Sequence, residues 1–398
     1  MFRIIAIGNP EFPFKKLDKN IFEIIYIIDK EQHCKKTFVT GNPIIVVDSF
    51  EDKNIRWIIQ GICKYKHIDA IVNFDEKYQF SINSIISDLG LNHINLNSIE
   101  IANDKFKTRE VISRLNLNNI PYSEITNKND IKKFIQNYGF PIVVKSKYGT
   151  GSKNIFFINS HEELNSIPDN LDENFIVEKY IPGDEYSAEF ITIYGKHYLM
   201  GITDKLTTGI PKFVEIEHIV NGCGMKQKSK VEDTIMQLLD GMRINIGITH
   251  TEFKIYDNEI YIIETHARPG GDCIMDLIEN ITGVDPYELF IYVLLGKEKI
   301  YNDMVLRFSN TSKSSGIRYL KHPKGKVKNI CINNDKIELE NGFVRMYMPY
   351  EIGSYTNSFD SSFDRDGWIM VISDSTEGVK NILNRIESQI KIKIDEEV

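Results

Sequence analysis

The sequence predicts a multidomain protein of mixed α/β and α+β class, with a parallel sheet at the N-terminus and antiparallel sheets after it. The chain has 398 residues, too many for one small core, which favours two or three domains. Short apolar runs alternate with helical patterns over the first hundred residues, whereas later segments resemble strand pairs joined by short turns. The composition, 42% hydrophobic and 26% charged with both signs mixed, is typical of a globular protein.

The first domain, residues 1–102, is predicted to be a doubly wound parallel sheet. Two segments, Glu51–Tyr65 and Lys77–Leu89, carry apolar residues at helical spacing. The first turn, Gly8–Pro13, lacks the Gly-x-Gly-x-x-Gly pattern with which such sheets bind dinucleotides. We therefore expect a scaffold or a substrate wall rather than a cofactor site. The predicted strands, each rich in isoleucine and valine, are Arg3–Gly8, Phe22–Asp29, Pro43–Asp48 and Ile68–Phe74.

The central segment, residues 103–300, is predicted to contain two hairpins among helices. The first hairpin spans residues 140–157 around a glycine-containing turn, and the second pairs Thr249–Tyr256 with Glu259–Glu264 across Asp257-Asn258. The remaining strands are predicted at Phe175–Glu178, Tyr186–Tyr194, Lys196–Thr203 and Phe213–Ile219. The helices are predicted at Lys105–Leu115, Lys128–Tyr138, about Lys230–Ile244, and Cys273–Thr282 with Gly283 as its C-cap.

The last segment, residues 301–398, is predicted to be a β-rich domain with an antiparallel sheet that closes off part of the site. A final helix is expected at about Thr376–Ile390. The strand-like runs are Gly316–Leu320, Val327–Ile332, Gly342–Met348 and Trp368–Ser373.

Charge and composition exclude several classes of partner. A net charge of -8 and a pI near 5.7 argue against nucleic acid as the main partner. No apolar run approaches the roughly 20 residues that span a bilayer, and the apolar run after Met1 is too short for a signal peptide. The five cysteines show no Cys-x-x-Cys spacing, so neither a zinc site nor a disulfide framework is indicated. A reducing cytoplasm is the expected location.

Acidic and basic side chains gather on the second hairpin. Glu264, His266 and Arg268 alternate, so on a strand all three would project from one face. Glu252 on the partner strand could face the same way, and two neighbouring carboxylates repel unless a divalent cation lies between them. Oxygen ligands in small number suit Mg²⁺ that also binds phosphates. A solvated sheet face is the alternative, but Arg268, which could clamp phosphate oxygens, favours the site.

The first hairpin carries a glycine loop and a lysine on an apolar strand. The loop Tyr148–Lys153 could bring backbone N–H groups against a phosphate, although such loops are often simple turns. Lys145 either reaches the surface or neutralises a ligand anion, and the nearby glycine loop favours the anion. After the strand predicted at Phe175–Glu178, an exposed backbone edge could bind an adenine, and Glu185 could bind a ribose. The alternative is that this segment is a polar linker.

The order of these motifs resembles that of the ATP-grasp superfamily. It looks most like the carboxylate–amine ligases that include bacterial L-amino-acid (dipeptide) ligases. This resemblance implies a small nucleotide-covering lobe at residues 103–180 and a metal-binding and catalytic lobe at residues 181–300. The matching motifs are Asp104-Lys105, Pro141-x-Val-Val-Lys145, the glycine loop, Glu178-Lys-Tyr-Ile-Pro-Gly-x-Glu185, Glu252, and Glu264-x-His-x-Arg268 with Gly270-Gly271.

The resemblance also implies roles for individual residues. Glu252 and Glu264 would ligate Mg²⁺, with Mn²⁺ as an alternative, and Arg268 would stabilise the acyl phosphate. Lys205 as a catalytic residue and His218 as a substrate contact come from segments that face the active site in the resembling ligases. ATP would be bound by Lys105, Lys145 and Ser152 at the phosphates, by Glu178, Tyr180 and Ile181 at the adenine, and by Glu185 at the ribose.

Two positions stay open within this resemblance. Many ATP-grasp enzymes carry Asn as a third metal ligand where this chain has His266. Imidazole is a poor ligand for a hard cation, so His266 would lie behind the metal ligands, contact substrate, or be a structural histidine. Gly270, Gly271 and Asp272 would lie next to the reacting carboxylate. Asp272 would then contact an amino group, or else cap the helix that begins at Cys273.

The implied activity is an ATP-dependent ligase that forms an amide through an acyl phosphate, releasing ADP and phosphate. Amino acids are the first choice for the carboxylate and amine substrates. Another carboxylate, a carrier protein, or biotin-carboxylase-like chemistry are alternatives within the superfamily. A non-catalytic ATP-binding module is the alternative of another class, and it would be expected to have lost the metal carboxylates or the arginine. The oligomeric state, a homodimer included, is open.

Overall fold

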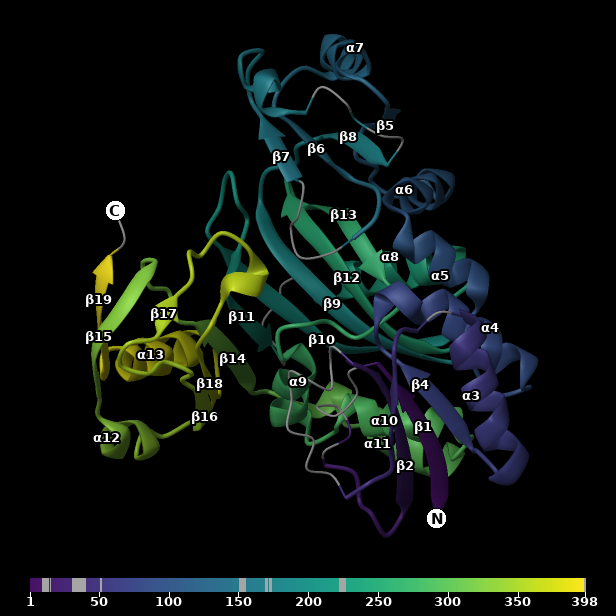
Figure 1. Cartoon of the computed structure of the whole chain (residues 1–398). Coiled ribbons are helices and arrows are strands. Elements are labelled where there is room, and N and C mark those ends of the chain that lie inside the picture. The colour runs from purple at the N-terminus through teal and green to yellow at the C-terminus, as the bar shows by residue number, and fades with distance from the viewer. Residues whose placement is uncertain are drawn as a thin grey trace.

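The computed structural model describes residues 1–8, 14, 16–30, 41–50, 52–149, 155–168, 171, 174–221 and 227–396. Within these residues the strands form four sheets. The mixed α/β and α+β class predicted from the sequence is confirmed (Figure 1). Residues 150–153 of the glycine loop, Ser152 among them, lie outside the described residues.

The N-terminal sheet is parallel throughout, with the strand order β3-β2-β1-β4. Alternate residues of β1 face opposite sides. Ile5 and Ile7 pack with α3 (Asp52–Tyr65) and α4 (Gln79–Asp88), whereas Ile4 and Ala6 join the core that contains α10 (Pro286–Leu294). The elements of this part are β1 (Phe2–Ile7), β2 (Phe22–Asp29), β3 (Ile44–Val47), α3 (Asp52–Tyr65), β4 (Ala70–Asn73), η1 (Glu76–Tyr78) and α4 (Gln79–Asp88).

The central sheet is large and antiparallel, with the strand order β13-β12-β9-β10-β11-β14-β18-β16. Its last three strands come from the C-terminal segment, so the sheet continues across residue 300, and the division of the chain at that residue stays a prediction. The strands are β9 (Asp184–Ile193), β10 (Lys196–Thr207), β11 (Glu215–Asn221), β12 (Gly247–Tyr256), β13 (Glu259–His266), β14 (Ser314–Tyr319), β16 (Phe343–Tyr347) and β18 (Trp368–Ser373).

Helices cover both faces of the central sheet. On β9, Ala188 and Phe190 pack into a core shared with α5, α6 and α8, whereas Ile191 and Ile193 pack on the other side with α9 and α10. None of the helices in the described part of the chain is long and apolar enough to cross a membrane. The helices are α5 (Leu96–Asn103), α6 (Lys105–Arg114), α8 (Lys228–Gly241), α9 (Ile274–Thr282), α10 (Pro286–Leu294), α11 (Glu298–Val305) and η3 (Phe308–Asn310).

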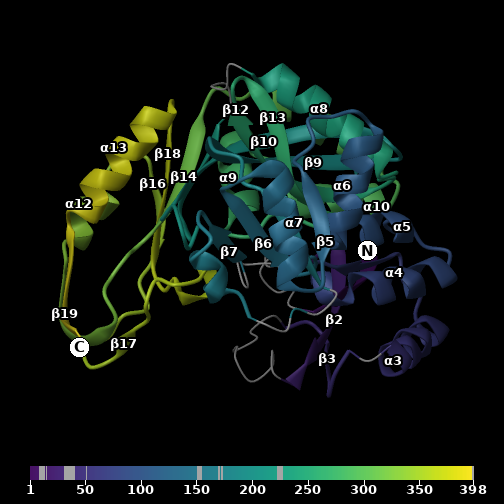
Figure 2. The same ribbon diagram turned by 90° about the horizontal axis from the view of Figure 1, so that it is seen from above.

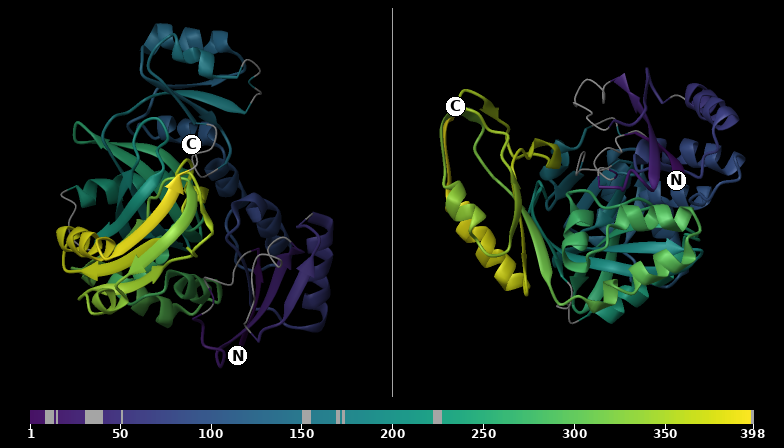
Figure 3. Two further views of the ribbon diagram at one scale, coloured as in Figure 1. Left: turned by 60° about the vertical axis from the view of Figure 1, so that its left-hand side comes forward. Right: turned by 90° about the horizontal axis from the view of Figure 1, so that it is seen from below.

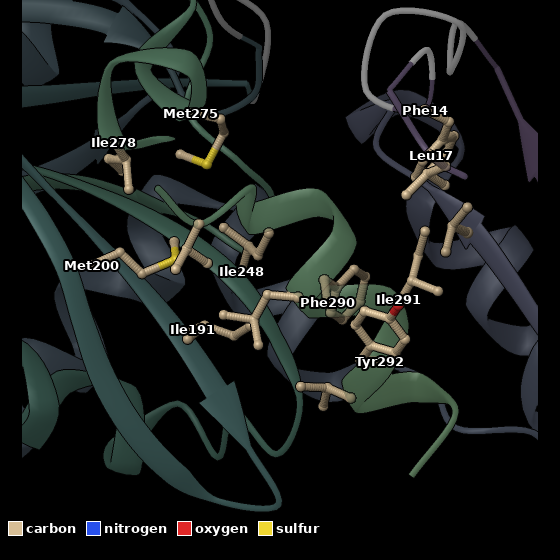
Figure 4. Packing of buried hydrophobic residues seen from close by; sticks show 14 of the residues in the cluster. Phe14, Leu17, Ile191, Met200, Ile248, Met275, Ile278, Phe290, Ile291 and Tyr292 are labelled. Carbon is tan, nitrogen blue, oxygen red and sulfur yellow. The ribbon is translucent and has the colours of Figure 1, made fainter. Parts of the chain in front are cut away.

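Helix α10 joins the N-terminal sheet to the central sheet. Figure 4 shows Phe290 and Tyr292 of this helix near Phe14 and Leu17 of the N-terminal part, with Ile248 of the central sheet on the other side. All five side chains belong to one buried cluster. No helix was predicted at residues 286–294, because this segment is apolar apart from Glu288 and shows no clear amphipathic period.

A small lobe lies above the central sheet and contains the predicted first hairpin (Figure 1). Strands β6 and β7 pair in antiparallel register, and the strand order is β5-β8-β6-β7. Helix α7 packs on this sheet through Ile131 and Phe134. The elements are β5 (Tyr122–Ile125), α7 (Lys128–Tyr138), β6 (Ile142–Ser146), β7 (Ile155–Ile158), η2 (Glu163–Ser166) and β8 (Phe175–Lys179).

The C-terminal segment adds a three-stranded sheet, which lies on the opposite side of the molecule from the N-terminal sheet (Figures 2 and 3). The predicted final helix to Ile390 is wrong at its end, because α13 stops at Glu387 and residues 390–396 form β19. Isoleucines at every second position from Ile390 give that segment a strand period. The elements are β15 (Gly325–Ile332), α12 (Asn334–Glu338), β17 (Tyr355–Thr356), η4 (Ser362–Asp364), α13 (Thr376–Glu387) and β19 (Ile390–Glu396).

Glycine at position 183, directly before β9, allows the backbone there to lie close to the backbone of Ile255. Its φ is +105°, and an added Cβ would lie 2.2 Å from the carbonyl oxygen of Ile255. Gly195, in the β9–β10 turn, also has a positive φ, +81°, but nothing lies within 4 Å of its added Cβ. We expect Gly183→Ala to lower the free energy of unfolding by about 3 kcal/mol and Gly195→Ala by about 1 kcal/mol in urea unfolding. Equal losses would contradict the contact with Ile255.

Candidate active site

Two cavities meet between the small lobe and the central sheet. The first cavity lies between the lobes, and six of the seven predicted ATP contacts line it: Lys105, Lys145, Glu178, Tyr180, Ile181 and Glu185. The seventh, Ser152, lies outside the described residues. The second cavity has a volume of about 340 Å³, and its wall contains Lys205, His218, His266, Arg268, Gly271 and Asp272.

The two cavities share three carboxylates. Glu215, Glu252 and Glu264 line both of them, so a molecule in each cavity would meet its neighbour at these side chains. Glu215 was not predicted. The strand predicted at Phe213–Ile219 alternates two glutamates with apolar residues, and that period of two is the signal that could have identified it.

Buried cations line the small-lobe side of the first cavity. Glu178 on β8 accepts from Lys145 on β6 at 2.8 Å and from the Arg109 Nε on α6 at 2.7 Å. Burial opposes ionisation of Glu178, but Arg109 and Lys145 hold its pKa at about 2. Burial and the neighbouring cations Arg109 and Lys105 lower the pKa of Lys145 in spite of Glu178. One carboxylate thus serves two cations, and this excess of positive charge suits an anionic ligand.

Arg109 also connects the small lobe to the central sheet. Its side chain is 1% exposed and donates to the backbone carbonyls of Ile262 and Ile263 on β13, at 2.6 and 2.9 Å. Sequence reasoning missed it, although it follows Lys105 by four residues and therefore lies on the same face of the predicted helix.

Lys105 lies where α6 meets the end of β13. Its Nζ is 3.0 Å from Glu264 Oε2 and donates to the Gly149 carbonyl at 3.0 Å. Burial disfavours the charged lysine, but Glu264 raises the pKa of Lys105 above its usual value. Lys105 therefore carries its charge between the glycine loop and the shared carboxylates.

An aromatic slot forms the other end of the first cavity. Tyr180 and Phe213 lie next to each other, with ring centroids 6.5 Å apart, and Lys254 Nζ is 4.8 and 5.8 Å from the two centroids. Val143, Ile155 and Ile263 complete an apolar lining of this cavity. Glu185 lies close by and pairs with Lys205 at 2.9 Å. Aromatic and apolar side chains beside a carboxylate can hold a nucleobase with its sugar.

Glu252 and Glu264 are cross-strand partners on β12 and β13, as the hairpin predicts. Glu252 Oε1 accepts from Lys205 Nζ at 2.6 Å and contacts His250 Nε2 at 3.1 Å. Burial opposes ionisation of Glu252, yet Lys205 and His250 hold its pKa well below its usual range. The pKa of Glu264 is likewise low, because Lys105 and His266 outweigh its burial. Both carboxylates are therefore ionised at neutral pH.

These two carboxylates fit a hard divalent cation that takes further ligands from phosphate and water. Among the described residues, no group of three or more His, Cys, Asp or Glu side chains could hold a metal ion by itself. Mg²⁺ is usually bound by one or two carboxylates together with substrate phosphates, so two suffice. A metal site at Glu252 and Glu264 stays a prediction that the donor set supports.

The predicted alternation of Glu264, His266 and Arg268 brings the three side chains together around Glu76 of η1. His266 contacts Glu264 with Nε2 and Glu76 with Nδ1, each at 3.0 Å, and Arg268 Nε donates to Glu76 at 2.7 Å. Burial opposes ionisation of Glu76, but His266 and Arg268 lower its pKa to about 2. Both ring nitrogens of His266 face carboxylates, which favours a role behind the metal ligands.

Glu76 was not identified from the sequence. It follows β4 by three residues, at the carboxyl end of a parallel strand, where ligands of such sheets commonly bind. The N-terminal domain therefore supplies a charged residue that contacts His266 and Arg268. This contact agrees with the expectation that the domain forms a wall of the substrate site, which stays a prediction.

Lys205 is surrounded by carboxylates on the sheet side of the site. Its side chain is 2% exposed and lies 2.6 Å from Glu252, 2.9 Å from Glu185 and 3.8 Å from Glu215. Burial disfavours the charge, but these carboxylates raise the pKa of Lys205 well above its usual value. Lys205 stays protonated at neutral pH, so it acts by its charge. The three anions around one cation suit a metal ion or an ammonium group.

Asp272 is held by His218 and by Arg365, which comes from the C-terminal segment. His218 Nε2 lies 2.8 Å from Asp272 Oδ2, and the Arg365 guanidinium donates to both carboxylate oxygens at 2.9 and 2.5 Å. The interpretation of Asp272 as a helix cap is wrong, because Cys273 is the N-cap of α9 and makes no side-chain cap bond. No motif in the last hundred residues pointed to Arg365.

Gly270 does not line the second cavity. An added Cβ at this position would lie 2.8 Å from His250 Nδ1 and 3.1 Å from Glu189 Oε2. Glycine is needed here so that the chain can pass over the buried His250–Glu189 pair, whose atoms are 2.6 Å apart. The geometry therefore does not support the predicted contact between Gly270 and substrate.

Comparisons with known proteins agree with this geometry. Residues 138–276 match the ATP-grasp domain family. An alanine–anticapsin ligase of Bacillus subtilis is 27% identical over 261 residues, which are 58% of this chain and 55% of that protein. The match thus spans about half the length of that curated relative.

Solved structures share the fold over the whole chain. The L-amino acid ligase from Bacillus licheniformis superposes with a TM-score of 0.81 at 17% identity, covering 100% of this chain and 99% of that one. The biotin carboxylase domain of the Hydrogenobacter thermophilus 2-oxoglutarate carboxylase, in complex with MgADP, gives a TM-score of 0.74 at 14% identity, covering 99% and 91%. The chain therefore has the ATP-grasp fold.

Glu178→Gln is expected to destabilise the protein in a pH-dependent way. The substitution leaves Arg109 and Lys145 buried without an anion, so we expect a loss of about 3–5 kcal/mol of unfolding free energy at pH 7. The pKa of Glu178 is lowered from its ordinary value of 4.5 to about 2. Its contribution is therefore complete above pH 4.5 and is lost as the pH falls toward 2.

Urea unfolding at pH 7, 4 and 3 measures this effect, and the difference between wild type and variant should shrink with the pH. Glu124→Gln is the control, because Glu124 pairs with Lys147 while half exposed and should cost less than about 1 kcal/mol. A difference for Glu178→Gln that stays constant down to pH 3 would contradict the role given to this carboxylate.

Proposed function

We propose that this chain, which has the ATP-grasp fold, is an ATP-dependent ligase that joins a carboxylate to an amine, with amino acids as substrates. The observation that carries the proposal is the shared wall of Glu215, Glu252 and Glu264 between the two cavities. A nucleotide in the first cavity and a carboxylate in the second would meet at this wall.

The first cavity suits ATP. The slot beside Tyr180 and Phe213 would take the adenine, and Glu185 the ribose hydroxyls. Lys105 and Lys145 would bind phosphate oxygens, since the small-lobe side has more buried cations than carboxylates. Ser152 in the glycine loop keeps the phosphate-covering role that the resemblance implies.

Glu252 and Glu264 would hold Mg²⁺, with Mn²⁺ as an alternative. A divalent cation at this position neutralises phosphate charge and orients the transferred group. The carboxylates are ionised before any metal binds, because Lys205 and Lys105 already lie against them. His250 and His266 fix the orientation of the two carboxylates.

The chemistry is phosphoryl transfer followed by acyl transfer. A substrate carboxylate oxygen attacks the γ-phosphorus of ATP, a new O–P bond forms, and the bond to the β-phosphate oxygen breaks to release ADP. A neutral amine then attacks the acyl carbon, the C–O bond to phosphate breaks, and the nitrogen loses a proton to solvent. Arg268 lines the second cavity and would stabilise the negative oxygens of both steps. Positioning and charge supply most of the catalysis.

Amino acids as substrates are supported by the names of the similar proteins, an alanine–anticapsin ligase and an L-amino acid ligase. The second cavity supports the same class, because it offers both cations and carboxylates to a zwitterion. A non-catalytic module is disfavoured, since Glu252, Glu264 and Arg268 are present and converge. A cytoplasmic location fits an enzyme that consumes ATP, and a homodimer stays a prediction.

ATP-dependent phosphate release, screened over single amino acids and pairs, tests the proposal. We expect release that requires a particular pair and yields ADP. Glu264→Gln should lower the rate roughly 100-fold or more, because one of the two predicted metal carboxylates is lost. Glu259→Gln on the same strand is the control, since this exposed carboxylate pairs with Lys230 and faces neither cavity. Release unchanged in Glu264→Gln would contradict the metal site.

Lys145→Met tests the phosphate side of the first cavity. We expect about 10- to 100-fold weaker binding of ATP and unchanged binding of adenosine, measured by calorimetry, because adenosine lacks the phosphates that Lys145 is proposed to bind. Lys147→Met on the same segment is the control, since Lys147 pairs with Glu124 instead. Equal weakening for ATP and adenosine would show that Lys145 only maintains the fold of the lobe.

A further inference from the structure

The end of the second cavity away from the nucleotide is built from an ion pair between two distant parts of the chain. Asp272 lies two residues before the start of α9, and Arg365 directly after η4. Both side chains line the cavity, together with His218, Ser362 and Ile274. Ile274 is the one apolar side chain among the described residues of this wall.

The pair is held in place by its own neighbours. Arg365 donates through both terminal nitrogens to Asp272 and through Nε to the Ser362 carbonyl at 2.8 Å. Its guanidinium lies 4.0 Å from the centroid of the Tyr319 ring, and its side chain is 6% exposed. Asp272 additionally contacts His218. The wall therefore presents fixed polar atoms whose two charges already cancel.

The backbone at Asp272 indicates that this arrangement is held in place. Asp272 and Cys273 both have left-handed conformations, with φ of +57° and +60°. Such conformations are unfavourable for residues other than glycine, and they persist where surrounding contacts enforce them, often at functional sites. The contacts here are Arg365 and His218, which direct the carboxylate into the cavity wall instead of onto the start of α9.

We propose that the Asp272–Arg365 pair sets the substrate class of the second cavity: amino acids with a short, uncharged polar side chain. This inference rests on the proposed ligase activity of the same site. A hydroxyl or amide can donate to Asp272 and accept from Arg365, and it leaves the charges balanced. A large apolar side chain would cover these polar atoms without a hydrogen bond in return. A charged side chain would add a buried charge without a partner.

The test is the binding of free amino acids to the full chain in the presence of Mg²⁺ and a non-hydrolysable ATP analogue. Serine and asparagine represent the polar class, leucine and phenylalanine the apolar class, and aspartate and lysine the charged class. We expect serine or asparagine to bind at least about tenfold tighter than the other four. Equal or tighter binding of leucine or phenylalanine would overturn the inference.

A double variant, Asp272→Asn with Arg365→Met, removes the ion pair without leaving one charge unpaired. Asparagine tolerates the left-handed conformation at residue 272. We expect the ratio of polar to apolar affinity to fall by about tenfold. The matched control is Asp276→Asn with Arg345→Met, which removes another pair, 2.7 Å long, between α9 and the C-terminal segment. That pair lines neither cavity, so the control should keep the wild-type ratio.

A further variant, Arg365→Lys, keeps the charge but loses the bidentate contact with Asp272. It should give an intermediate ratio of polar to apolar affinity. An unchanged ratio in the double variant, with folding verified by thermal melting, would overturn the inference. If the double variant does not fold, the wild-type affinities and Arg365→Lys still decide the question.

Formation of ADP, measured separately, distinguishes this inference from the proposed activity. Polar preference in binding without turnover would support the inference and remove the ligase. Turnover without polar preference would support the ligase activity and overturn the inference. No binding of any of the six amino acids would overturn the inference.

Discussion

The site is organised around the repulsion between two partly buried carboxylates on neighbouring strands. Glu252 and Glu264 face each other across β12 and β13, and neither can remain ionised in a buried site without cations nearby. Four cationic or protonatable side chains lie against them: Lys205, His250, Lys105 and His266. Each of the two carboxylates receives one lysine and one histidine. The pair is thereby kept ionised and ready for a metal ion, which could add its charge to that of the side chains.

This requirement brings distant parts of the chain together. Lys105 comes from α6, and Glu76 from the N-terminal domain holds His266 and Arg268. Arg109 joins the small lobe to β13 through backbone carbonyls, so the strand that carries Glu264 is fixed from two sides. On the small-lobe side cations outnumber carboxylates around Glu178, whereas around Lys205 the carboxylates are in excess. A phosphate and a metal ion would meet at the boundary between these two regions.

Local sequence patterns allowed the central part of the site to be predicted. The period of two grouped Glu264, His266 and Arg268, the expected pairing across the second hairpin added Glu252, and a lysine on an apolar strand indicated Lys145. Glu76 and Arg365 could not be found in this way, because they reach the site through contacts nearly 200 and 93 residues away in sequence, and neither carries a local motif.

The fold shows the same limit of local patterns. The alternation of short strands and helices predicted the parallel sheet. Helix α10 was not predicted, because most of its residues are buried by other elements and its sequence is apolar apart from Glu288. Strand β19 was not predicted either, since its partner β15 lies about sixty residues earlier and the preceding helical period runs up to its first residue.

The most direct measurement of the central claim follows one oxygen atom. An amino acid with ¹⁸O in its carboxylate is incubated with a partner amine, Mg²⁺ and ATP, and the released phosphate is weighed by mass spectrometry. If the carboxylate attacks the γ-phosphate at the wall of Glu215, Glu252 and Glu264, each phosphate released should carry one ¹⁸O. Phosphate without the label would mean that water, and not the substrate carboxylate, receives the phosphoryl group, and it would contradict the assignment of the two cavities.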